Sequence, residues 1–254
     1  MKLAIAGKGG SGKTSISGTI ARQLARDGYR VLAIDGDSNP NLGLTLGIPA
    51  ERMSDMPTLP DDLIRRTAQG AELRRPLEEI MASHSVSGPD GVELLVMAHP
   101  QHANTGCLCQ MHATVRTIID AASGGEKDVF LLDTEASPEH LTRGTALYAD
   151  AMLTVVEPYF KSLETGRRMA VLAQDLGLER VALIANKMRD ERDLEAVTTF
   201  AEKHGLEMGG TVPLDPLFTE AERAGVAPLD VRADAPAMQA IATIARRWGG
   251  DGRA

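Results

Sequence analysis

Short apolar runs alternate with longer segments of helical periodicity along most of the chain. Seven runs are expected to form strands: Lys2–Ala6, Arg30–Ile34, Val92–Ala98, Val129–Leu132, Ala151–Val156, Val181–Ala185 and Met208–Val212. Six segments are expected to form helices: Thr14–Arg26, Met111–Ala122, His140–Tyr148, Ser162–Leu176, Glu191–His204 and Asp234–Trp248. Strands that are apolar throughout are typical of a sheet covered on both faces. The pattern predicts an α/β fold with a mostly parallel sheet flanked by helices on both faces.

The segment of about residues 49–90 departs from this pattern. It is rich in proline, methionine and charge, and its periodicity is weak. We expect a helical insertion at the edge of the sheet. The 254 residues are 43% hydrophobic, which is enough for one large core. We therefore expect a single domain over residues 1–254.

A glycine-rich loop follows the first expected strand and opens onto the first expected helix. Its sequence, GKGGSGKT, runs from Gly7 to Thr14. Glycines let backbone N–H groups converge on a phosphate, and the helix that follows points its positive end at the same anion. Lys13 is then expected to reach the outer phosphates of ATP or ADP, and the Thr14 hydroxyl to bind Mg²⁺. The residues expected to bind the nucleotide here are Gly7, Lys8, Gly9, Gly10, Ser11, Gly12, Lys13, Thr14 and Ser15. This is a P-loop NTPase motif in its expected strand–loop–helix context.

Acidic residues follow two other strands, where a parallel sheet places its ligands. Asp35 and Asp37 lie in the loop DGDSNPN, and Asp133 follows the apolar run Val129–Leu132. Asp133 resembles the end of a Walker B strand and is expected to hold Mg²⁺ through water. Asp35 is expected to lie near the Mg²⁺ ion, next to its ligands, without binding the ion itself. For Asp35 and Asp37, a capping or Asx-turn role is the alternative.

Cys107 and Cys109 form the motif GCLC, and they are the chain's two cysteines. Two thiolates offer two ligands, whereas structural Zn²⁺ takes four. A second copy of the chain related by a two-fold axis would supply the other two. Zn²⁺ or Ni²⁺ fits such a site, and Cu(I) is an open alternative. His99, His102 and His112 flank the pair as further candidate ligands or as ordinary polar residues, and the cysteines have buried packing as their alternative role.

Composition and charge narrow the class of protein. The net charge of −8 argues against broad nucleic-acid binding. The N-terminus does not resemble a signal peptide, and the apolar runs are too short to span a membrane. Two closely spaced cysteines do not form a disulfide framework. We therefore expect a cytoplasmic protein that binds neither membrane nor nucleic acid.

The form KGGxGKT resembles the deviant P-loop shared by MinD, ParA and the nitrogenase iron protein. Over nearly the whole chain, GKGGSGKT, DGDSNPN, GCLC, DTEASPEHLTRGT, ANKM and VPLD are similar to the CooC-type carbon monoxide dehydrogenase maturation ATPases. That resemblance implies an ATP-hydrolysing homodimer that delivers nickel to a client metalloenzyme such as carbon monoxide dehydrogenase. One departure is Ser137-Pro138, where switch II of that family usually carries a glycine.

The resemblance also implies roles for single residues. Lys8 would cross the dimer interface to the partner's nucleotide, and Asp37 would orient the attacking water. Lys8, Lys13 and Asp37 are thus the expected catalytic residues. The segments that would hold adenine supply Asn186, Lys187, Pro213 and Asp215; a simple turn at the end of the strand is the alternative for Asn186.

Two other functions remain open at this stage. A MinD- or ParA-like positioning ATPase would recruit a partner to membrane or DNA, but Ile241–Trp248 is not a long basic amphipathic stretch. A reductase like the nitrogenase iron protein would hold an Fe–S cluster, which four thiolates of two chains permit. That family draws its cluster cysteines from two separated segments, whereas this chain has cysteines at 107 and 109 alone. The metallochaperone interpretation is favoured.

Overall fold

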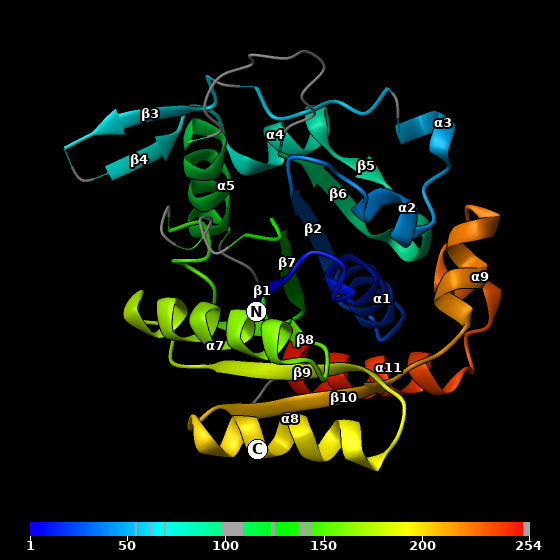
Figure 1. The fold of residues 1–254 in the computed structure, drawn as a ribbon. Helices are drawn as coiled ribbons and strands as arrows, with labels where there is room; N and C mark the ends of the chain where they lie inside the picture. Colours follow the sequence, from blue (N-terminus) through cyan, green and yellow to red (C-terminus); the bar gives the residue numbers. More distant parts are fainter. Residues whose placement is uncertain are drawn as a thin grey trace.

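A computed structural model gives the fold (Figure 1). It describes residues 1–250 except 54, 61, 69, 98–108, 123–124, 138–140 and 142–143. No helix in this described part of the chain is long and apolar enough to cross a membrane.

The centre of the fold is an eight-stranded sheet in the order β10-β9-β8-β1-β7-β2-β6-β5. Seven of its strands run parallel, and β5 pairs antiparallel with β6 at one edge. The strands are β1 (Lys2–Gly7), β2 (Arg30–Gly36), β5 (Val86–Ser87), β6 (Glu93–Val96), β7 (Asp128–Thr134), β8 (Ala151–Val156), β9 (Val181–Met188) and β10 (Glu207–Pro213). β1 lies between β7 and β8, so the loop that follows it opens at the middle of the sheet.

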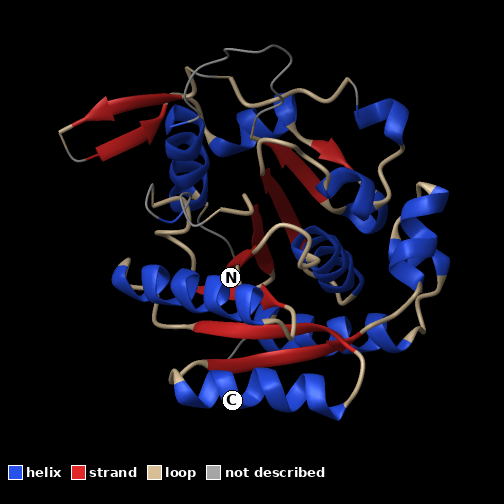
Figure 2. Cartoon of the chain, viewed as in Figure 1, coloured by secondary structure: helices blue, strands red, loops and turns tan. Residues whose placement is uncertain are grey.

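Helices cover both faces of this sheet (Figure 2). Successive side chains of a strand point to opposite faces, so β1 sends Leu3 and Ile5 to one face and Ala4 and Ala6 to the other. The first face packs against α1 (Lys13–Arg26) and α11 (Pro236–Gly249). The second packs against α5 (Cys109–Ala121), α7 (Phe160–Asp175) and α8 (Glu191–Lys203). On the second face, the alanines of β1 pack in one cluster with Met169, Ala170 and Ala173 of α7.

The expected α/β class is confirmed, and each of the seven expected strands is present within a few residues of its expected bounds. Five of the six expected helices are also present. The expectation of a helix over His140–Tyr148 is wrong for its second half, because residues 144–148 form turns. Gly144 has φ 69°, a left-handed conformation that an α-helix does not contain. The remainder of that segment, apart from Leu141, lies outside the described residues.

The segment of about residues 49–90 is only partly helical. It contains α3 (Ala50–Met53), α4 (Leu77–His84) and the short 3₁₀ helix η1 (Pro89–Gly91). Between the first two lies a hairpin of β3 (Ile64–Thr67) and β4 (Gly70–Leu73), which projects beside α5 in Figure 1. Arg65 and Glu72 face each other across this hairpin in a 2.9 Å ion pair. Residues 64–73 are stabilised by pairing between two strands and not by contacts within a helix. The expectation of a helical insertion is therefore wrong for this part of the segment.

Three short helices were not expected from the sequence. α2 (Leu42–Leu46) follows the acidic loop after β2, while α9 (Leu217–Ala224) and α10 (Pro228–Val231) follow β10. Each is too short for its apolar residues to repeat over more than two turns. The carboxyl ends of β1, β2, β7, β9 and β10 all lie along one edge of the sheet, because these strands are parallel.

Candidate functional site

The loop between β1 and α1 forms a tight phosphate-binding turn. Ser11 N donates to Lys8 O at 3.0 Å, which closes the turn, and α1 begins at Lys13. The side chain of Lys13 is buried, whereas Lys8 is exposed. Lys13 therefore lies inside the loop, whereas Lys8 points toward solvent.

Two glycines of the loop lie where no side chain fits. Gly7 has φ 152°, and a Cβ there would stand 2.6 Å from the carbonyl oxygen of Val155 on β8. Gly12 has φ 95°, and a Cβ there would collide with the amide nitrogen of Asn186. Both positions require glycine for conformation and for space. The loop thus lies in close contact with β8 at Gly7 and with the end of β9 at Gly12.

The P-loop and β7 are joined through hydroxyl groups. Thr14 Oγ1 donates to Asp133 Oδ2 at 2.7 Å, and Ser17 Oγ donates to Asp133 Oδ1 at 2.8 Å. Burial raises the pKa of Asp133, and the nearby Lys13 ammonium opposes that rise. Thr14 and Asp133, the two residues expected to bind Mg²⁺, therefore lie together.

Asp35 lies beside Asp133, because the two residues are register partners on β2 and β7. It is fully buried, and its carboxylate accepts hydrogen bonds from the backbone N–H groups of Leu42 at 2.8 Å and Asp37 at 3.2 Å. Burial, reinforced by the charge of Asp133, raises the pKa of Asp35 to about 7. Asp35 therefore holds the acidic loop from behind. These contacts fit both roles considered for Asp35, the Asx-turn role and the place behind the metal ligands.

Asp37 is half-buried in the same loop, two residues before the exposed Asn39. Its Oδ1 accepts a hydrogen bond from the N–H of Asn39 at 2.9 Å, which is the contact of an Asx turn. Oδ2 makes none of the hydrogen bonds recorded among the described residues. The turn contact and the expected role toward water use different oxygens, so Asp37 can fill both.

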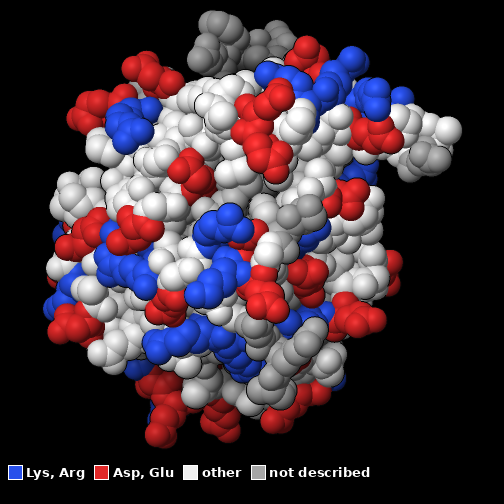
Figure 3. Space-filling view, turned by 180° about the vertical axis from the view of Figure 1, so that it is seen from behind, with Lys and Arg blue, Asp and Glu red and all other residues white. Residues whose placement is uncertain are grey.

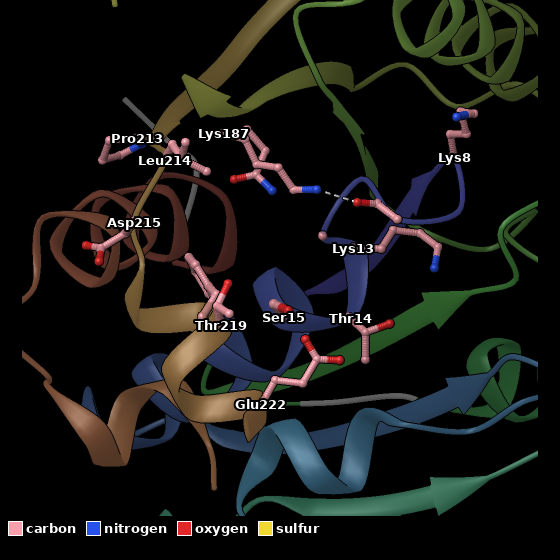
Figure 4. Close-up of a pocket in the computed structure, with 14 residues that line it drawn as sticks. Lys8, Lys13, Thr14, Ser15, Lys187, Pro213, Leu214, Asp215, Thr219 and Glu222 are labelled. Carbon is pink, nitrogen blue, oxygen red and sulfur yellow. Dashed lines mark hydrogen bonds between the residues drawn. The ribbon is translucent and has the colours of Figure 1, made fainter. Parts of the chain in front are cut away.

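A cavity of about 440 Å³ opens beside the P-loop (Figure 4). The sequence-predicted residues that line it are Lys8, Gly10, Gly12, Lys13, Thr14, Ser15, Asn186, Lys187, Pro213 and Asp215. Its remaining walls come from Leu214 and from α9, with Phe218, Thr219 and Glu222. Of the residues predicted to bind nucleotide, Gly7, Gly9 and Ser11 belong to the loop without lining this cavity. The cavity is therefore bounded by the loop on one side and the ends of β9 and β10 on the other.

Asn186 and Lys187 tie the end of β9 to the P-loop. Asn186 Nδ2 donates to Ser11 O at 2.7 Å, and Lys187 Nζ donates to Gly10 O at 2.6 Å, the dashed line in Figure 4. Lys187 also forms a 2.9 Å ion pair with Glu157. Its φ of 63° is a left-handed conformation that costs free energy for a residue with a side chain. The two contacts of its ammonium group hold it there.

Asp215 lies in the cavity wall, and its carboxylate also makes contacts within the protein. Its Oδ1 accepts from the backbone N–H of Leu217 at 3.0 Å and lies 3.7 Å from the Arg232 guanidinium. The carboxylate thus supports the start of α9 while the residue forms part of the cavity wall. Pro213 ends β10 at the same wall.

The donor set fits a nucleotide with Mg²⁺. Mg²⁺ is bound in proteins by one or two carboxylates together with phosphates and water, and hydroxyl and carboxylate oxygens meet here at Thr14 and Asp133. Among the described residues, Ser11 Oγ and Asn186 Oδ1 are buried without a hydrogen-bond partner. Buried polar atoms of this kind are uncommon, and both lie against the loop. Backbone N–H groups and a buried lysine suit an anionic ligand, and the amide oxygen of Asn186 suits a hydrogen-bond donor on that ligand.

The cysteine motif lies mostly beyond the described residues. Cys107, His99 and His102 are outside them, and of Cys109 the backbone is described, as the first residue of α5. Groups of three or more potential metal ligands are absent among the described residues. His112 is fully buried, with Nδ1 3.2 Å from Thr145 Oγ1. The ring of His112 is thus packed inside the fold, and its role as a candidate metal ligand stays a prediction.

Comparison with known families decides the class of this site. Residues 2–229 match the family described as the CobQ/CobB/MinD/ParA nucleotide binding domain. The chain belongs to this family. It is a P-loop ATPase of the CobQ/CobB/MinD/ParA type, as the loop sequence predicts.

Individual relatives of this ATPase cover almost its full length. It is 35% identical over 244 residues to the carbon monoxide dehydrogenase accessory protein CooC of Rhodospirillum rubrum, covering 91% of this chain and 90% of that protein. It is 32% identical to an uncharacterized ATP-binding protein of Methanocaldococcus jannaschii, covering 89% of this chain and 90% of that one. The MinD cell division protein of Aquifex aeolicus has the same fold, with a TM-score of 0.72, 24% identity and coverage of 98% and 97%. The recognised resemblance to CooC-type ATPases is thus confirmed.

Sequence reasoning missed several residues of the ATPase site. Glu157, which forms an ion pair with Lys187, directly follows β8, so its position at the end of a strand was the available signal. Phe218, Thr219 and Glu222 lie on α9, whose eight residues gave no clear helical signal. These residues line the cavity because α9 lies beside the P-loop in the folded chain, which the sequence alone does not show.

Proposed function

We propose that this chain is an ATP-hydrolysing, dimerising metallochaperone that binds a soft metal through Cys107 and Cys109. Its proposed client is a nickel enzyme of the carbon monoxide dehydrogenase class, because the relative from Rhodospirillum rubrum is named as an accessory protein of that enzyme. The proposal is of one ATPase domain spanning residues 1–254, working as a homodimer with ATP, ADP and Mg²⁺.

One observation carries the nucleotide part of this proposal. The Thr14–Asp133 hydrogen bond places the P-loop hydroxyl and the acidic end of β7 together at the mouth of a cavity lined by Lys13. When bound, Mg²⁺ would be held by these oxygens and would neutralise charge on the phosphates. Lys13 is buried at the start of α1, so it binds the phosphates without reorganising.

Lys8 and Asp37 are proposed to act when two chains meet. Lys8 is exposed at the rim of the cavity, where it is accessible to a second copy. Asp37 would orient the attacking water through its carboxylate, in the loop that Asp35 supports. Asn186, Lys187, Pro213 and Asp215 are proposed to bound the base and ribose, since they line the far side of the cavity.

The metal is proposed as cargo shared by two chains. Each chain supplies Cys107 and Cys109, and four thiolates suit Zn²⁺ or Ni²⁺. Cys109 is the first residue of α5. That helix packs against β2 and β7, the strands that carry Asp35 and Asp133. The proposed metal site and the nucleotide site are thus connected through one helix and two strands.

The MinD- or ParA-like alternative gains no support from the C-terminal helix. The apolar face of α11 is buried against the sheet, and Trp248 Nε1 donates to Gly209 O at 3.0 Å. A helix engaged in this way has no apolar face left for a membrane surface. Figure 3 shows acidic and basic side chains intermingled on the face opposite that of Figure 1, and the formal net charge is −8. Neither feature favours DNA.

The test is reconstitution of a client enzyme. Nickel-free carbon monoxide dehydrogenase is incubated with limiting Ni²⁺, this protein and ATP, and the recovery of CO oxidation is measured. We expect recovery to require ATP and to fail with Lys13→Ala and with Cys107→Ala/Cys109→Ala. Recovery that is equally fast without this protein, or with either variant, would contradict the proposal.

A further inference from the structure

His112 occupies an unusual position between the nucleotide site and the proposed metal site. It lies in the first turn of α5, three residues after Cys109, at which the helix begins. Its side chain is fully buried, which is uncommon for histidine. The nucleotide mechanism above does not use it.

The ring of His112 faces two segments that follow sheet strands. Nε2 lies 4.0 Å from Glu135 Oε2, and Nδ1 lies 3.2 Å from Thr145 Oγ1. Glu135 follows β7 directly, two residues after Asp133. His112 therefore contacts the segment that resembles switch II, at a point next to the proposed Mg²⁺ site.

Glu135 has a second contact on its other side. Its Oε1 lies 3.5 Å from Ser38 Oγ, at hydrogen-bond distance, and Ser38 follows Asp37 in the loop after β2. One carboxylate thus lies between the loop that carries the proposed water-orienting residue and the helix that begins at Cys109. Its two oxygens face in these two directions.

The remainder of α5 is held differently. Val115, Ile118 and Ile119 pack in an apolar cluster with Leu32 and Leu132 of the sheet. That packing fixes the later turns of the helix, since close-packed apolar side chains resist displacement. In the first turn, Met111 also packs in this cluster, while His112 is the residue that faces Glu135 and that a shift of Glu135 would reach first.

We infer that His112 is a positioning residue that couples the nucleotide state, read through Glu135, to the metal affinity of the cysteine motif. This inference rests on the proposed function. Movement of Glu135 with the bound nucleotide would shift His112 and, through the helix backbone, Cys109. Coupling free energies between sites typically correspond to about 5–150-fold in affinity.

The experiment measures the coupling itself. The affinity of the homodimer for Zn²⁺ is determined by competition with a chromophoric chelator, in the presence of ADP and of a non-hydrolysable ATP analogue. The ratio of the two dissociation constants is the coupling factor, which we expect to be about fivefold or more in the wild-type protein. In His112→Phe the factor should fall below about twofold, while affinity in ADP and the melting temperature stay near wild-type. His112→Gln, which keeps a hydrogen-bonding group, should retain more of the coupling.

A second substitution keeps the test valid where His112→Phe does not fold. Thr145→Val removes the hydroxyl that faces Nδ1 while preserving side-chain shape, and it should also lower the factor. Its matched control is Thr117→Val, since Thr117 is a buried threonine of α5 that donates to Ala113 O at 2.8 Å and should leave the factor unchanged.

The outcomes separate this inference from the proposed function. A wild-type coupling factor that persists in His112→Phe and Thr145→Val would overturn the inference alone. Metal affinity lost equally with both nucleotides in His112→Phe would make His112 a ligand and would also overturn it. Absence of cysteine-dependent Zn²⁺ binding in the wild-type protein would overturn the proposed function, and the inference with it.

Discussion

Thr14 and Asp133 are joined by a 2.7 Å hydrogen bond although 119 positions separate them in the chain. The bond connects the start of α1 to the end of β7, and Ser17 donates to the other oxygen of the same carboxylate. The hydroxyl groups of Thr14 and Ser17 and the carboxylate of Asp133 therefore lie together in the folded chain. This arrangement explains why the P-loop and the acidic strand end act as one site.

The first prediction concerns the hydroxyl of Thr14. Thr14→Val should raise the Mg²⁺ concentration needed for half-maximal ATP hydrolysis by about tenfold or more, as loss of a group that orients or binds a metal typically does. Thr14→Ser keeps the hydroxyl and is the matched control, with a requirement near wild-type. The measurement is an Mg²⁺ titration of the hydrolysis rate; equal midpoints for the two variants would show that the hydroxyl is not a ligand.

Lys8→Ala tests whether Lys8 acts across a dimer interface. Nucleotide affinity should stay near wild-type, because Lys13 remains in place, while ATP-dependent dimerisation and turnover are lost. A cation supplied from a partner in other ATPases contributes about 10³-fold or more, so we expect a drop of at least about 10²-fold in turnover. Lys203→Ala, at an exposed lysine at the end of α8, serves as the control. Hydrolysis at the wild-type rate in Lys8→Ala would remove the trans role.

Asp37→Asn separates turnover from binding. The amide keeps an oxygen for the contact with the N–H of Asn39, so the turn should persist. It cannot orient or deprotonate water as the carboxylate does, and the turnover number should fall by about 10²-fold or more. Asp175→Asn at the end of α7 is the control. If ATP affinity fell and the turnover number at saturation did not, Asp37 would be a binding residue instead.

The raised pKa of Asp35 predicts a pH-dependent stability in the absence of Mg²⁺. The folded-state pKa of about 7 lies above the ordinary value of 3.8, so the folded protein binds the extra proton between these values. Stability from this group is therefore greatest at low pH and falls as pH rises toward 7. Relative to Asp35→Asn, wild-type protein in EDTA should lose on the order of 1 kcal/mol of unfolding free energy between pH 5 and pH 7.5. Urea unfolding curves measure this; parallel pH profiles for the two proteins would contradict it.

Much of the fold could be predicted because its signals are local. The apolar runs that form β1, β7 and β8 are continuous, as buried parallel strands require, and the P-loop string specifies its own turn. The acidic groups were located because parallel strands end at one edge of the sheet. Asp133 was found in this way without any contact being known.

The remainder depends on contacts between distant parts of the chain. The left-handed conformation of Lys187 is held by Glu157, 30 positions away, and nothing in the local sequence predicts it. The hairpin β3–β4 depends on pairing across its turn. His112 was read as a candidate metal ligand because it is near Cys109, whereas its burial follows from packing against the segments of Glu135 and Thr145.

The metal stoichiometry tests the central claim most directly. Anaerobically purified protein is titrated with Ni²⁺ or Zn²⁺, and bound metal per chain is measured together with molecular mass. We expect one ion per two chains and metal-promoted dimerisation, both lost in Cys107→Ala/Cys109→Ala while ATP binding persists. Affinity should also fall at low pH, since thiolates must lose protons to bind. His99→Ala/His102→Ala is the control and should keep the site. One tightly bound ion per chain that survives removal of both cysteines would contradict the account.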